Sequence, residues 1–346
     1  MTGRPLAHRT ACDLTVIGAG PAGLFATYYA GFRGLSVTLI DAQPEAGGQV
    51  TALYPAKVIH DVAGFPGVLG ADLIAGLVEQ ARAYEPRLVF GANVVDLVHD
   101  DAGAAWTITL ADGAAIDSRT VVLATGVGGI RPRTLAAGHG WHDRGVTYVI
   151  PDPTAHADEH VVIVGGGDSA LDWALQLRPI ARSVTVVHRR RTFRAHASSI
   201  TRAKREGVVL LTESEIQAVH GDTHVRGVVV RDGTGAEFEI PADTVIGALG
   251  LVTTPSPFAA WGVKMTDRRI LVDSAMQTNL TGVFAIGDAS TYHGKVALIA
   301  TGFGEAATAV NNAAVQIDPD LTLSPGHSTD EDVDVPSGDA TSGLEP

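Results

Sequence analysis

The sequence predicts an α/β protein in which two similar units each combine a parallel sheet with helices. The first observation is a pair of glycine-rich loops, at residues 18–23 and 165–170, each between an apolar strand-like segment and a helix-compatible segment. The second is an apolar strand within residues 278–288, which returns the chain to the first unit. We therefore expect two Rossmann-like domains with three-layer (ββα) architecture, the first of them discontinuous.

The first glycine loop has the spacing of a pyrophosphate-binding turn. Its first glycine can make the tight turn, its second leaves no side chain between the backbone and a pyrophosphate, and its last lets helix and strand pack closely. The N–H groups that open the following helix then face the phosphates. A second strand, at residues 36–40, ends in an acid that can accept a hydrogen bond from a ribose hydroxyl. The predicted contacts are Gly18, Gly20, Pro21, Ala22, Gly23 and Asp41.

The second glycine loop follows an apolar strand at residues 161–164 and opens a helix that runs to residue 177. The second strand of this unit, at residues 184–187, is followed by basic residues instead of an acid. A carboxylate would repel a 2′-phosphate, whereas guanidinium groups bind one with two parallel hydrogen bonds. A basic turn that faces only solvent is the alternative, but this place in the unit favours NADP over NAD. The predicted contacts are Gly165, Gly167, Asp168, Ser169, Ala170, His188, Arg189, Arg190 and Arg194.

The remaining segments supply further strands and helices. A helix is expected at residues 71–84, and a long helix rich in small residues at 295–315. A buried strand at residues 120–123 runs into an Ala-Thr-Gly loop, and the strand within 278–288 ends in Gly287 and Asp288. Other short strands are expected at residues 88–90, 94–98, 106–110, 208–211, 225–230 and 244–249.

Length and composition limit the functional classes. The 346 residues suffice for two domains, and the 45% hydrophobic and 18% charged content suits a globular protein. No apolar run approaches the ~18 residues of a membrane span. The first ten residues are polar and lack the apolar core of a signal peptide, so we expect a cytoplasmic protein. A single cysteine, Cys12, excludes an internal disulfide and intramolecular dithiol chemistry.

The net charge of −13 is unevenly distributed. Eight acids lie in residues 316–346, which hold no lysine or arginine, whereas residues 121–247 balance 14 basic residues against 14 acidic ones. This pattern argues against general nucleic-acid binding and fits a local anion site. Past residue 318 the chain is rich in Ser, Gly, Pro and acids, so the last stretch is expected to be disordered.

The loops together resemble the two-dinucleotide flavoprotein reductases of the thioredoxin-reductase architecture, over residues 12–329. The resemblance implies FAD at the first site and NADPH at the second. Asp288 then contacts the ribityl chain, and helix backbone at Val296 and Ala297 faces the pyrimidine edge of the flavin. Thioredoxin reductases carry Cys-x-x-Cys shortly before the second loop, but residues 145–152 contain no cysteine here. Dithiol exchange needs two thiols, so this chain cannot perform it.

The most similar group is the thioredoxin-reductase-like ferredoxin–NADP⁺ reductases. Matching stretches are Ala-Leu-Tyr-Pro at 52–55, Asp-Val-Ala-Gly-Phe-Pro at 61–66, Phe-Arg-Ala-His at 193–196, a Gly-Phe-Gly-Glu helix from 302, and His-Ser-Thr at 327–329. In that family an aromatic ring covers each face of the flavin, which implies stacking roles for Tyr54 and His327. The family is homodimeric, and the C-terminal extension is expected to reach the partner subunit's flavin. The acidic tail 330–346 departs from the pattern.

The same resemblance assigns the rest of the FAD site and the domain boundaries. Other expected FAD contacts are Gly48, Gln49, Asp61, Val94, Thr125, Gly126, Ile130, Gly287, Ser328 and Thr329. The FAD domain is expected at residues 1–124 and 249–318, the NADPH domain at 125–248, and an extension at 319–346. Taken singly, Tyr54 could be a core aromatic, Asp61 a turn former and His327 part of a mobile tail.

The function implied by this resemblance is electron transfer between NADPH and a one-electron carrier, ferredoxin or flavodoxin. The flavin does the chemistry, so no catalytic acid or base is required, and we expect no metal site. One alternative is an NADPH oxidase or quinone reductase that uses oxygen or a small acceptor. Another is a non-catalytic FAD/NADP-binding redox sensor. Steady turnover onto ferredoxin separates the reductase from both.

Overall fold

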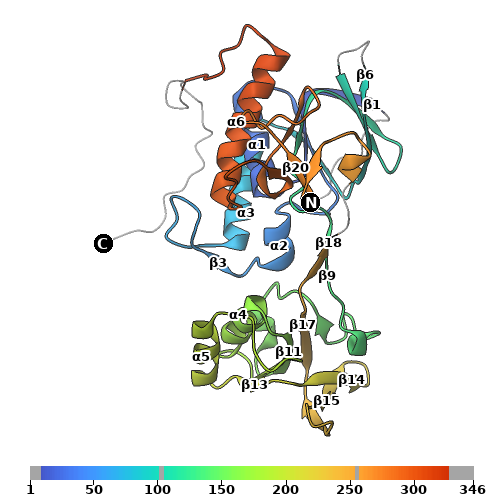
Figure 1. Cartoon of the computed structure of the whole chain (residues 1–346), viewed down its shortest axis with the longest axis vertical. Helices are drawn as coiled ribbons and strands as arrows, with labels where there is room; N and C mark the ends of the chain where they lie inside the picture. Colours follow the sequence, from blue (N-terminus) through green and yellow to red (C-terminus); the bar gives the residue numbers. More distant parts are fainter. Residues whose placement is uncertain (1–8, 101–104, 254–256, 327–346) are drawn as a thin grey trace.

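The computed structural model describes residues 9–100, 105–253 and 257–326. It has two lobes joined by a narrow ribbon of two strands (Figure 1). Each lobe contains parallel strands with helices packed against them, as the sequence predicts. The sheet of the first lobe is mixed, because two of its strands pair antiparallel. The expected α/β class with two Rossmann-like units is confirmed.

The first lobe is built on a seven-stranded sheet. Its order is β5 (Arg87–Phe90), β2 (Val37–Asp41), β1 (Arg9–Ile17), β8 (Ala115–Leu123), β7 (Ala105–Leu110) and β6 (Val94–Asp100), with β21 (Val283–Ala285) also paired to β8. β21 runs parallel to β8, with Val283 opposite Val121, although about 160 residues separate them in the chain. The first lobe is therefore discontinuous, as predicted.

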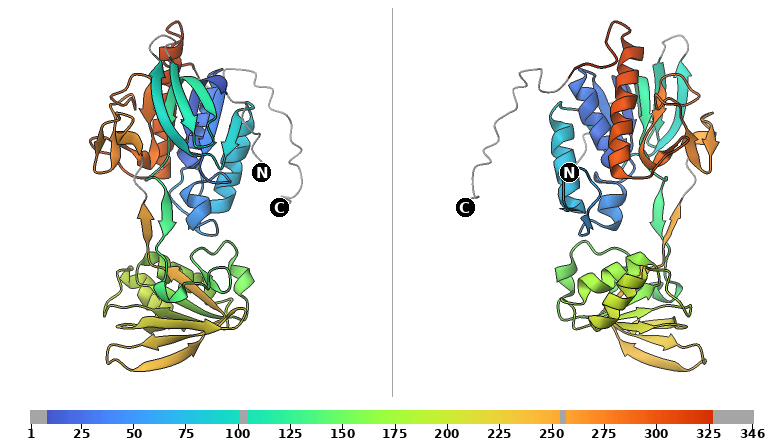
Figure 2. Two further views of the ribbon diagram at one scale, coloured as in Figure 1. Left: turned by 90° about the vertical axis from the view of Figure 1, so that its right-hand side faces the viewer. Right: turned by 60° about the vertical axis from the view of Figure 1, so that its left-hand side comes forward.

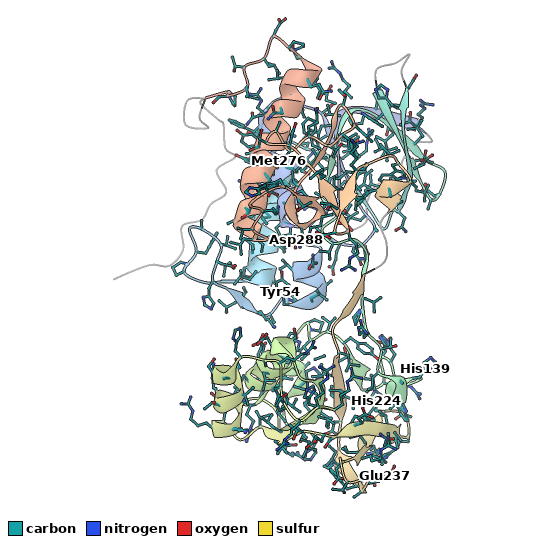
Figure 3. All side chains as sticks on the ribbon, in the orientation of Figure 1. Tyr54, His139, His224, Glu237, Met276 and Asp288 are labelled. Atoms are coloured by element: carbon teal, nitrogen blue, oxygen red, sulfur yellow. The ribbon has the colours of Figure 1, made fainter. Side chains whose placement is uncertain are left out.

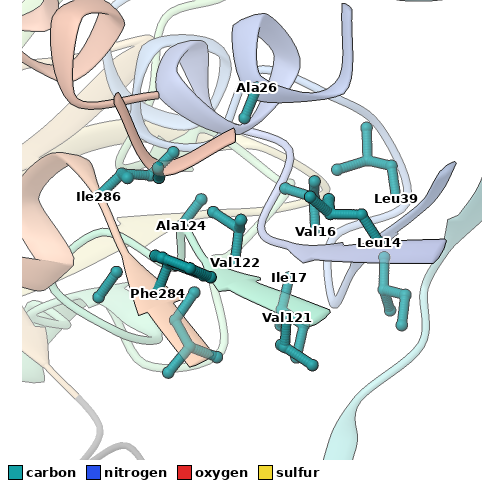
Figure 4. Packing of buried hydrophobic residues seen from close by; sticks show 14 of the residues in the cluster. Leu14, Val16, Ile17, Ala26, Leu39, Val121, Val122, Ala124, Phe284 and Ile286 are labelled. Carbon is teal, nitrogen blue, oxygen red and sulfur yellow. The ribbon is translucent and has the colours of Figure 1, made fainter. Parts of the chain in front are cut away.

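Three helices cover this sheet and position its loops: α1 (Pro21–Phe32), α3 (Gly70–Arg82) and α6 (Ile299–Ile317). α1 packs against both of the others, and the views agree that the three lie together beside the sheet (Figure 2). The core between the layers includes Leu14, Val16, Leu39, Val122 and Phe284, all almost fully buried (Figure 4). Strands buried on both faces have continuous apolar runs, which is why the sequence reveals them clearly.

The second lobe contains a five-stranded parallel sheet and a separate antiparallel one. The parallel order is β10 (Val146–Thr147), β17 (Thr244–Ala248), β11 (His160–Gly165), β12 (Ser183–Val187) and β13 (Val209–Leu211). Its helices are α4 (Asp168–Leu177) and α5 (Ala197–Arg205). The antiparallel sheet is β14 (Glu215–Gly221), β15 (Val225–Arg231) and β16 (Glu237–Pro241).

The two lobes meet in two ways. Strands β9 (Ile130–Pro132) and β18 (Leu251–Thr253) pair antiparallel and form the connecting ribbon (Figure 2). Side chains of α4 also contact the segment after α2 (Gln49–Leu53) in the first lobe. The first lobe also contains β3 (Val58–Ile59), β4 (Val68–Leu69), β19 (Met265–Thr266), β20 (Arg269–Leu271), β22 (Ser290–Thr291) and the 3₁₀ turns η3 (Pro257–Ala259) and η4 (Gly287–Ala289). The second has η1 (Ala136–Gly138) and η2 (Pro153–His156).

One predicted element begins later than expected. Helix α6 starts at Ile299, so Val296 and Ala297 lie before the helix and not inside it. Leu298 is extended, with φ −132° and ψ 153°, and the Lys295 side chain is directed back into the lobe. Two strands of the antiparallel sheet, β14 and β16, have no counterpart among the predicted ones. None of the helices in the described part of the chain is long and apolar enough to cross a membrane.

Candidate functional site

The first glycine loop is fixed by close packing. Gly18 has φ +112°, and a Cβ there would overlap the Ala124 carbonyl. A Cβ on Gly23 would overlap the Gly18 carbonyl, whereas one on Gly20 would meet nothing within 4 Å. The first and last glycines are therefore required by the protein's own backbone. The middle glycine faces free space, which is where a pyrophosphate would lie.

The N-terminus of α1 opens toward the same space. Gly20 is its N-cap and Pro21 its first residue, and no side chain caps the helix. The first turn holds no acidic residue that would repel an anion. The free N–H groups and the positive end of the helix dipole therefore suit a phosphate group.

Asp41, the last residue of β2, is bound to the loop itself. Its Oδ2 accepts a hydrogen bond from Ala19 N at 2.6 Å, and its Oδ1 accepts one from Gln43 N at 2.8 Å. Burial raises the pKa of this carboxyl group, and the backbone hydrogen bonds oppose the shift. Each carboxylate oxygen has two acceptor sites, so Asp41 can still accept from a ribose hydroxyl.

Two further loops border the space in front of α1. A Cβ on Gly48 would lie 3.1 Å from Gly20 Cα, and a Cβ on Gly126 would lie 3.2 Å from Gln49 Nε2. The hydroxyl of Thr125 is buried and has no hydrogen-bond partner among the described residues. A buried unpaired hydroxyl in this position fits a bound polar ligand. The residues present are thus suited to FAD.

The Gly287–Asp288 turn lies against the first glycine loop. A Cβ on Gly287, or on Gly302 in α6, would lie 3.2 Å from the Ala22 Cβ, so three distant segments converge. Burial raises the pKa of Tyr54, and the charges of Asp288 and Asp61 add to the shift. Each of the two carboxylates therefore acts electrostatically on the Tyr54 hydroxyl. Figure 3 shows Tyr54 and Asp288 on the part of the first lobe that is nearest the second lobe.

The other predicted FAD contacts lie on separate elements or outside the described residues. Val94 is half-buried at the start of β6, opposite Leu110, and Ile130 begins the connecting ribbon. The helical setting predicted for Val296 and Ala297 is wrong, because both precede α6, and Val296 is exposed. His327, Ser328 and Thr329 lie outside the described residues, as does the acidic tail.

The second glycine loop repeats the packing of the first. A Cβ on Gly165 would overlap the Ala248 carbonyl and lie 3.1 Å from the Ala170 Cβ. Gly167, the N-cap of α4, faces free space, and no side chain caps the helix. Ser169 is exposed in its first turn. This loop, too, leaves an open place at a helix N-terminus for a phosphate group.

Two residues predicted to bind NADPH hold the second loop together. Asp168 Oδ1 accepts a hydrogen bond from His196 N at 2.9 Å. His188 is buried, lies where a Cβ on Gly166 would be, and stacks on Phe193 with ring centroids 5.0 Å apart. Burial lowers the pKa of His188, so the ring is neutral and its Nε2–H donates to the Thr192 carbonyl at 3.1 Å.

The arginines after β12 are arranged differently from His188. Arg189, Arg190 and Arg194 are exposed, and the Arg194 backbone N–H donates to the Gly166 carbonyl at 2.7 Å. The basic segment is thereby tied to the glycine loop, while its guanidinium groups stay accessible. This arrangement suits an exchangeable ligand with a 2′-phosphate.

Two groups of contacts were not predicted from the sequence. Lys57 and Ala56 contact α4, across the two lobes. Tyr292, Lys295 and Glu305 form a buried polar cluster under the Gly287–Asp288 turn. A signal for the second was present, because Glu305 is the only charged residue in the otherwise apolar and neutral α6.

Comparison with known proteins agrees with this geometry. The sequence profile of the family "pyridine nucleotide-disulphide oxidoreductase" matches residues 12–313. The chain belongs to this family. The match spans both glycine loops and the returning strand β21, so it covers both lobes.

Three similar curated relatives are named ferredoxin–NADP reductase. The chain is 50% identical to a ferredoxin–NADP reductase of Salinispora tropica, covering 92% of this chain and 98% of the relative. It is 49% identical to one of Frankia alni, over 95% and 99%, and 44% identical to one of Thermus thermophilus, over 92% and 97%. Within the family the chain therefore belongs with the ferredoxin–NADP reductases, and the predicted resemblance is confirmed.

Solved structures give the same fold. A thioredoxin reductase of T. acidophilum matches with a TM-score of 0.71 and 26% identity, over 88% of this chain and 98% of that one. The Lactococcus lactis thioredoxin reductase matches with a TM-score of 0.70 and 25% identity, over 88% and 99%. The predicted thioredoxin-reductase-like architecture is confirmed.

Proposed function

We propose that this chain transfers electrons between NADPH and ferredoxin, or flavodoxin, through bound FAD and without a redox-active disulfide. The observation that carries the proposal is the contrast between its two glycine loops, one beside a half-buried acid that is bonded to the loop and the other beside exposed arginines. The relatives named ferredoxin–NADP reductase support it over nearly the whole chain. FAD and NADP(H) are the cofactors.

The chain's own residues bind and orient the cofactors. Asp41, Thr125 and the N-terminus of α1 hold FAD, and Tyr54 covers one face of its ring. When bound, FAD accepts a hydride and returns single electrons, which is chemistry that no side chain supplies. The second loop and the arginines after β12 hold NADPH, whose nicotinamide must come within ~3–3.5 Å of the flavin.

The cysteine content excludes the disulfide chemistry that the family is named after. Cys12 is the only cysteine, and its Sγ lies 3.3 Å from Thr15 Oγ1 and 3.7 Å from Ser118 Oγ within the first sheet. A dithiol cycle needs a second thiol that can close a disulfide. The electrons must therefore leave the flavin directly for an external carrier. A reducing cytoplasm is the compartment that we propose.

The connecting ribbon supports the domain assignment. We assign residues 1–124 and 249–318 to FAD, residues 125–248 to NADPH and residues 319–346 to an extension. β9 and β18 pair just outside the second parallel sheet, so both chain crossings lie close together. Each assigned domain then has its own hydrophobic core.

We also propose a homodimer in which the extension reaches the partner's flavin. Arg33 Nη2 donates to the Thr322 carbonyl at 2.9 Å, so the extension begins beside the C-terminal end of α1. That end is a helix length, about 18 Å, from the first glycine loop. The five residues from Thr322 to His327 span at most about 18 Å. That reach is no longer than the distance to the glycine loop itself, so we expect a flavin of a second subunit to be the better target for His327.

Two truncations test the extension. Ending the chain before Ser324 should keep FAD bound but alter the flavin spectrum and raise the rate of reaction with oxygen. Ending it after Thr329 removes only the acidic segment and is the matched control. Mixing the shorter form with a full-length subunit that cannot bind FAD should restore the spectrum if the extension acts in trans. Identical spectra and oxidase rates for both truncations and the full chain would exclude a role for His327.

The main test is turnover. NADPH should rapidly bleach the bound flavin, and cytochrome c reduction should depend strongly on added ferredoxin or flavodoxin. Fast oxygen or quinone reduction that ferredoxin does not increase would favour the oxidase or quinone reductase. Flavin that NADPH reduces without steady turnover onto any acceptor would favour the redox sensor.

A further inference from the structure

The Gly287–Asp288 turn is held at both backbone groups of one glycine. Gly287 N donates to Glu305 Oε2 at 2.7 Å, and the Gly287 carbonyl accepts from Lys295 Nζ at 3.0 Å and Ser290 Oγ at 2.9 Å. Gly287 has φ +63°, a conformation that other residues rarely adopt. The position of Asp288, the next residue, therefore depends on these hydrogen bonds, which we call the clamp.

The clamp is a buried ion pair with a third partner. Lys295 Nζ donates to Glu305 Oε1, and only 4% and 3% of the two side chains are exposed. The Tyr292 hydroxyl donates to the same Oε1 at 2.8 Å. Burial and the Glu305 carboxylate raise the pKa of Tyr292 to about 12, so its phenol remains protonated. Each charge is thus surrounded by hydrogen-bond partners.

Stability alone does not account for such a pair. Removing two charges from water costs more than their attraction usually returns, and well-packed apolar residues in their place are often neutral or stabilising. Breaking only one partner, in contrast, leaves a buried charge without compensation. A buried pair at a turn that faces the cofactor space is better explained by what it positions.

The cluster joins the two chain segments that the flavin needs. Lys295 directly precedes Val296 and Ala297, and its side chain returns to Gly287. The hydrogen bond from Lys295 Nζ to the Gly287 carbonyl therefore closes the loop of residues 287–295. Asp288 lies at the start of this loop, and the Val296 backbone directly follows its end. Gly302, one turn before Glu305 in α6, packs against Gly287 and Ala22 and anchors the cluster to the first glycine loop.

We propose that Tyr292, Lys295 and Glu305 are positioning residues for the flavin, which fix Asp288 and the segment before α6 relative to each other. This inference rests on the FAD site of the proposed function. The three residues do not touch the reacting atoms. They set where the ribityl contact and the backbone donors at the ring edge lie.

A double substitution separates positioning from stability. Lys295→Met with Glu305→Leu removes both charges and keeps an apolar, filled interior. We expect the apoprotein to stay folded, with a small loss of stability because the Gly287 N–H and the Tyr292 hydroxyl lose their acceptor, while the Kd for FAD rises about tenfold. The visible absorption bands and the midpoint potential of the bound flavin should also change. Lys295→Arg keeps the charge and the donors, and should restore wild-type values.

A matched control removes an ion pair from the same lobe but far from the turn. Arg9→Met with Asp117→Leu breaks an exposed pair between β1 and β8. It should leave the FAD affinity, spectrum and potential unchanged. The proposal would be overturned if the Lys295→Met, Glu305→Leu variant kept the wild-type FAD affinity, spectrum and potential.

The proposal can be decided even if the double variant does not fold. Tyr292→Phe removes one hydroxyl from the cluster and should shift the flavin potential in a folded protein, whereas unchanged absorption and potential would overturn the proposal. These measurements need neither NADPH nor ferredoxin. A wild-type protein that binds FAD but does not turn over with ferredoxin would contradict the proposed function and leave this test valid.

Discussion

The two glycine loops share one geometry but differ in the residues after their second strands. In both loops the first glycine lies against a carbonyl of a neighbouring strand's end, Ala124 in the first and Ala248 in the second. β2 ends in Asp41, which is half-buried and accepts a hydrogen bond from Ala19 N. After β12 comes His188, buried against Gly166, and then exposed arginines. Backbone packing therefore fixes the conformation of each loop, while the residues at the end of the second strand determine which nucleotide we expect to bind.

The comparison also separates a permanent site from an exchangeable one. The first space is bordered by segments from four parts of the chain, including the Gly287–Asp288 turn. In the second, the arginines remain accessible. A cofactor that stays bound through turnover suits the enclosed site, and a coenzyme that must leave after each hydride transfer suits the open one.

The largest expected effect comes from adding one methyl group to each loop. Gly18→Ala places a Cβ on the Ala124 carbonyl at φ +112°, so we expect loss of FAD and a destabilisation of about 1–3 kcal/mol. Gly165→Ala places a Cβ on the Ala248 carbonyl. It should keep FAD bound but raise the KM for NADPH strongly. The measurements are flavin absorbance per protein and steady-state kinetics.

Gly76→Ala, in α3 and outside both loops, is the control, because a Cβ there meets nothing within 4 Å. It should change neither the FAD content nor the KM for NADPH. Loss of flavin in the Gly165 variant, with none in the Gly18 variant, would reverse the assignment of the two sites.

The next effect tests the choice of coenzyme. Arg189→Ala with Arg190→Ala removes the charge-assisted hydrogen bonds to a 2′-phosphate, so the KM for NADPH should rise about tenfold or more. The KM for NADH should hardly change, and FAD content should not change. Arg182→Ala, an exposed arginine before β12, is the control. An equal loss with both coenzymes would show that these arginines do not distinguish them.

The sequence predicted the parts of the fold that local chemistry determines. The strands beside each loop contain continuous apolar runs, and β2, β11 and β12 begin and end within one residue of their expected bounds. β1 is longer than its apolar run, because it begins at Arg9. The acid at the end of β2 and the basic residues after β12 could be read directly. The predicted start of α6 was wrong because the backbone before Ile299 is extended and exposed, while the Lys295 side chain turns back to the Gly287 carbonyl.

Contacts between distant residues could not be predicted in the same way. Nothing near Lys57 indicates Asp172, which lies 115 residues away. β14 and β16 escaped notice because most of their residues are exposed or half-buried and neither strand contains an apolar run. Asp168 and His188 were assigned to the coenzyme by motif alone, whereas their hydrogen bonds show which parts of the loop they hold.

A smaller effect tests whether the two sites are coupled. Lys57, three residues after Tyr54, forms an ion pair with Asp172 of α4 at 2.8 Å, and Gln176 Nε2 donates to the Ala56 carbonyl at 3.1 Å. The pair is half-exposed, so it adds little stability. Lys57→Glu should slow flavin reduction by NADPH about two- to fivefold, as expected for losing such a contact.

The exchange Lys57→Asp with Asp172→Lys should recover most of that rate in stopped-flow measurements. Arg202→Glu, which breaks an exposed pair within α5, should have no effect and serves as the control. If the exchanged pair is as slow as the single variant, the contact between the lobes does not assist hydride transfer.

The smallest expected effect concerns Cys12, the only residue of the sequence that is capable of thiol chemistry. Cys12 is half-buried in β1, and its Sγ lies 3.5 Å from the Leu14 carbonyl as well as close to two hydroxyl groups. A serine hydroxyl can make the same hydrogen bonds, so Cys12→Ser should change stability by about 1 kcal/mol or less. Flavin reduction by NADPH and electron transfer to ferredoxin should be unchanged, and neither form should reduce a protein disulfide. Loss of flavin reduction in the variant would contradict this prediction. A disulfide reductase activity of the wild type that Cys12→Ser removes would also contradict it, because electrons would then pass through Cys12 as well as through the flavin.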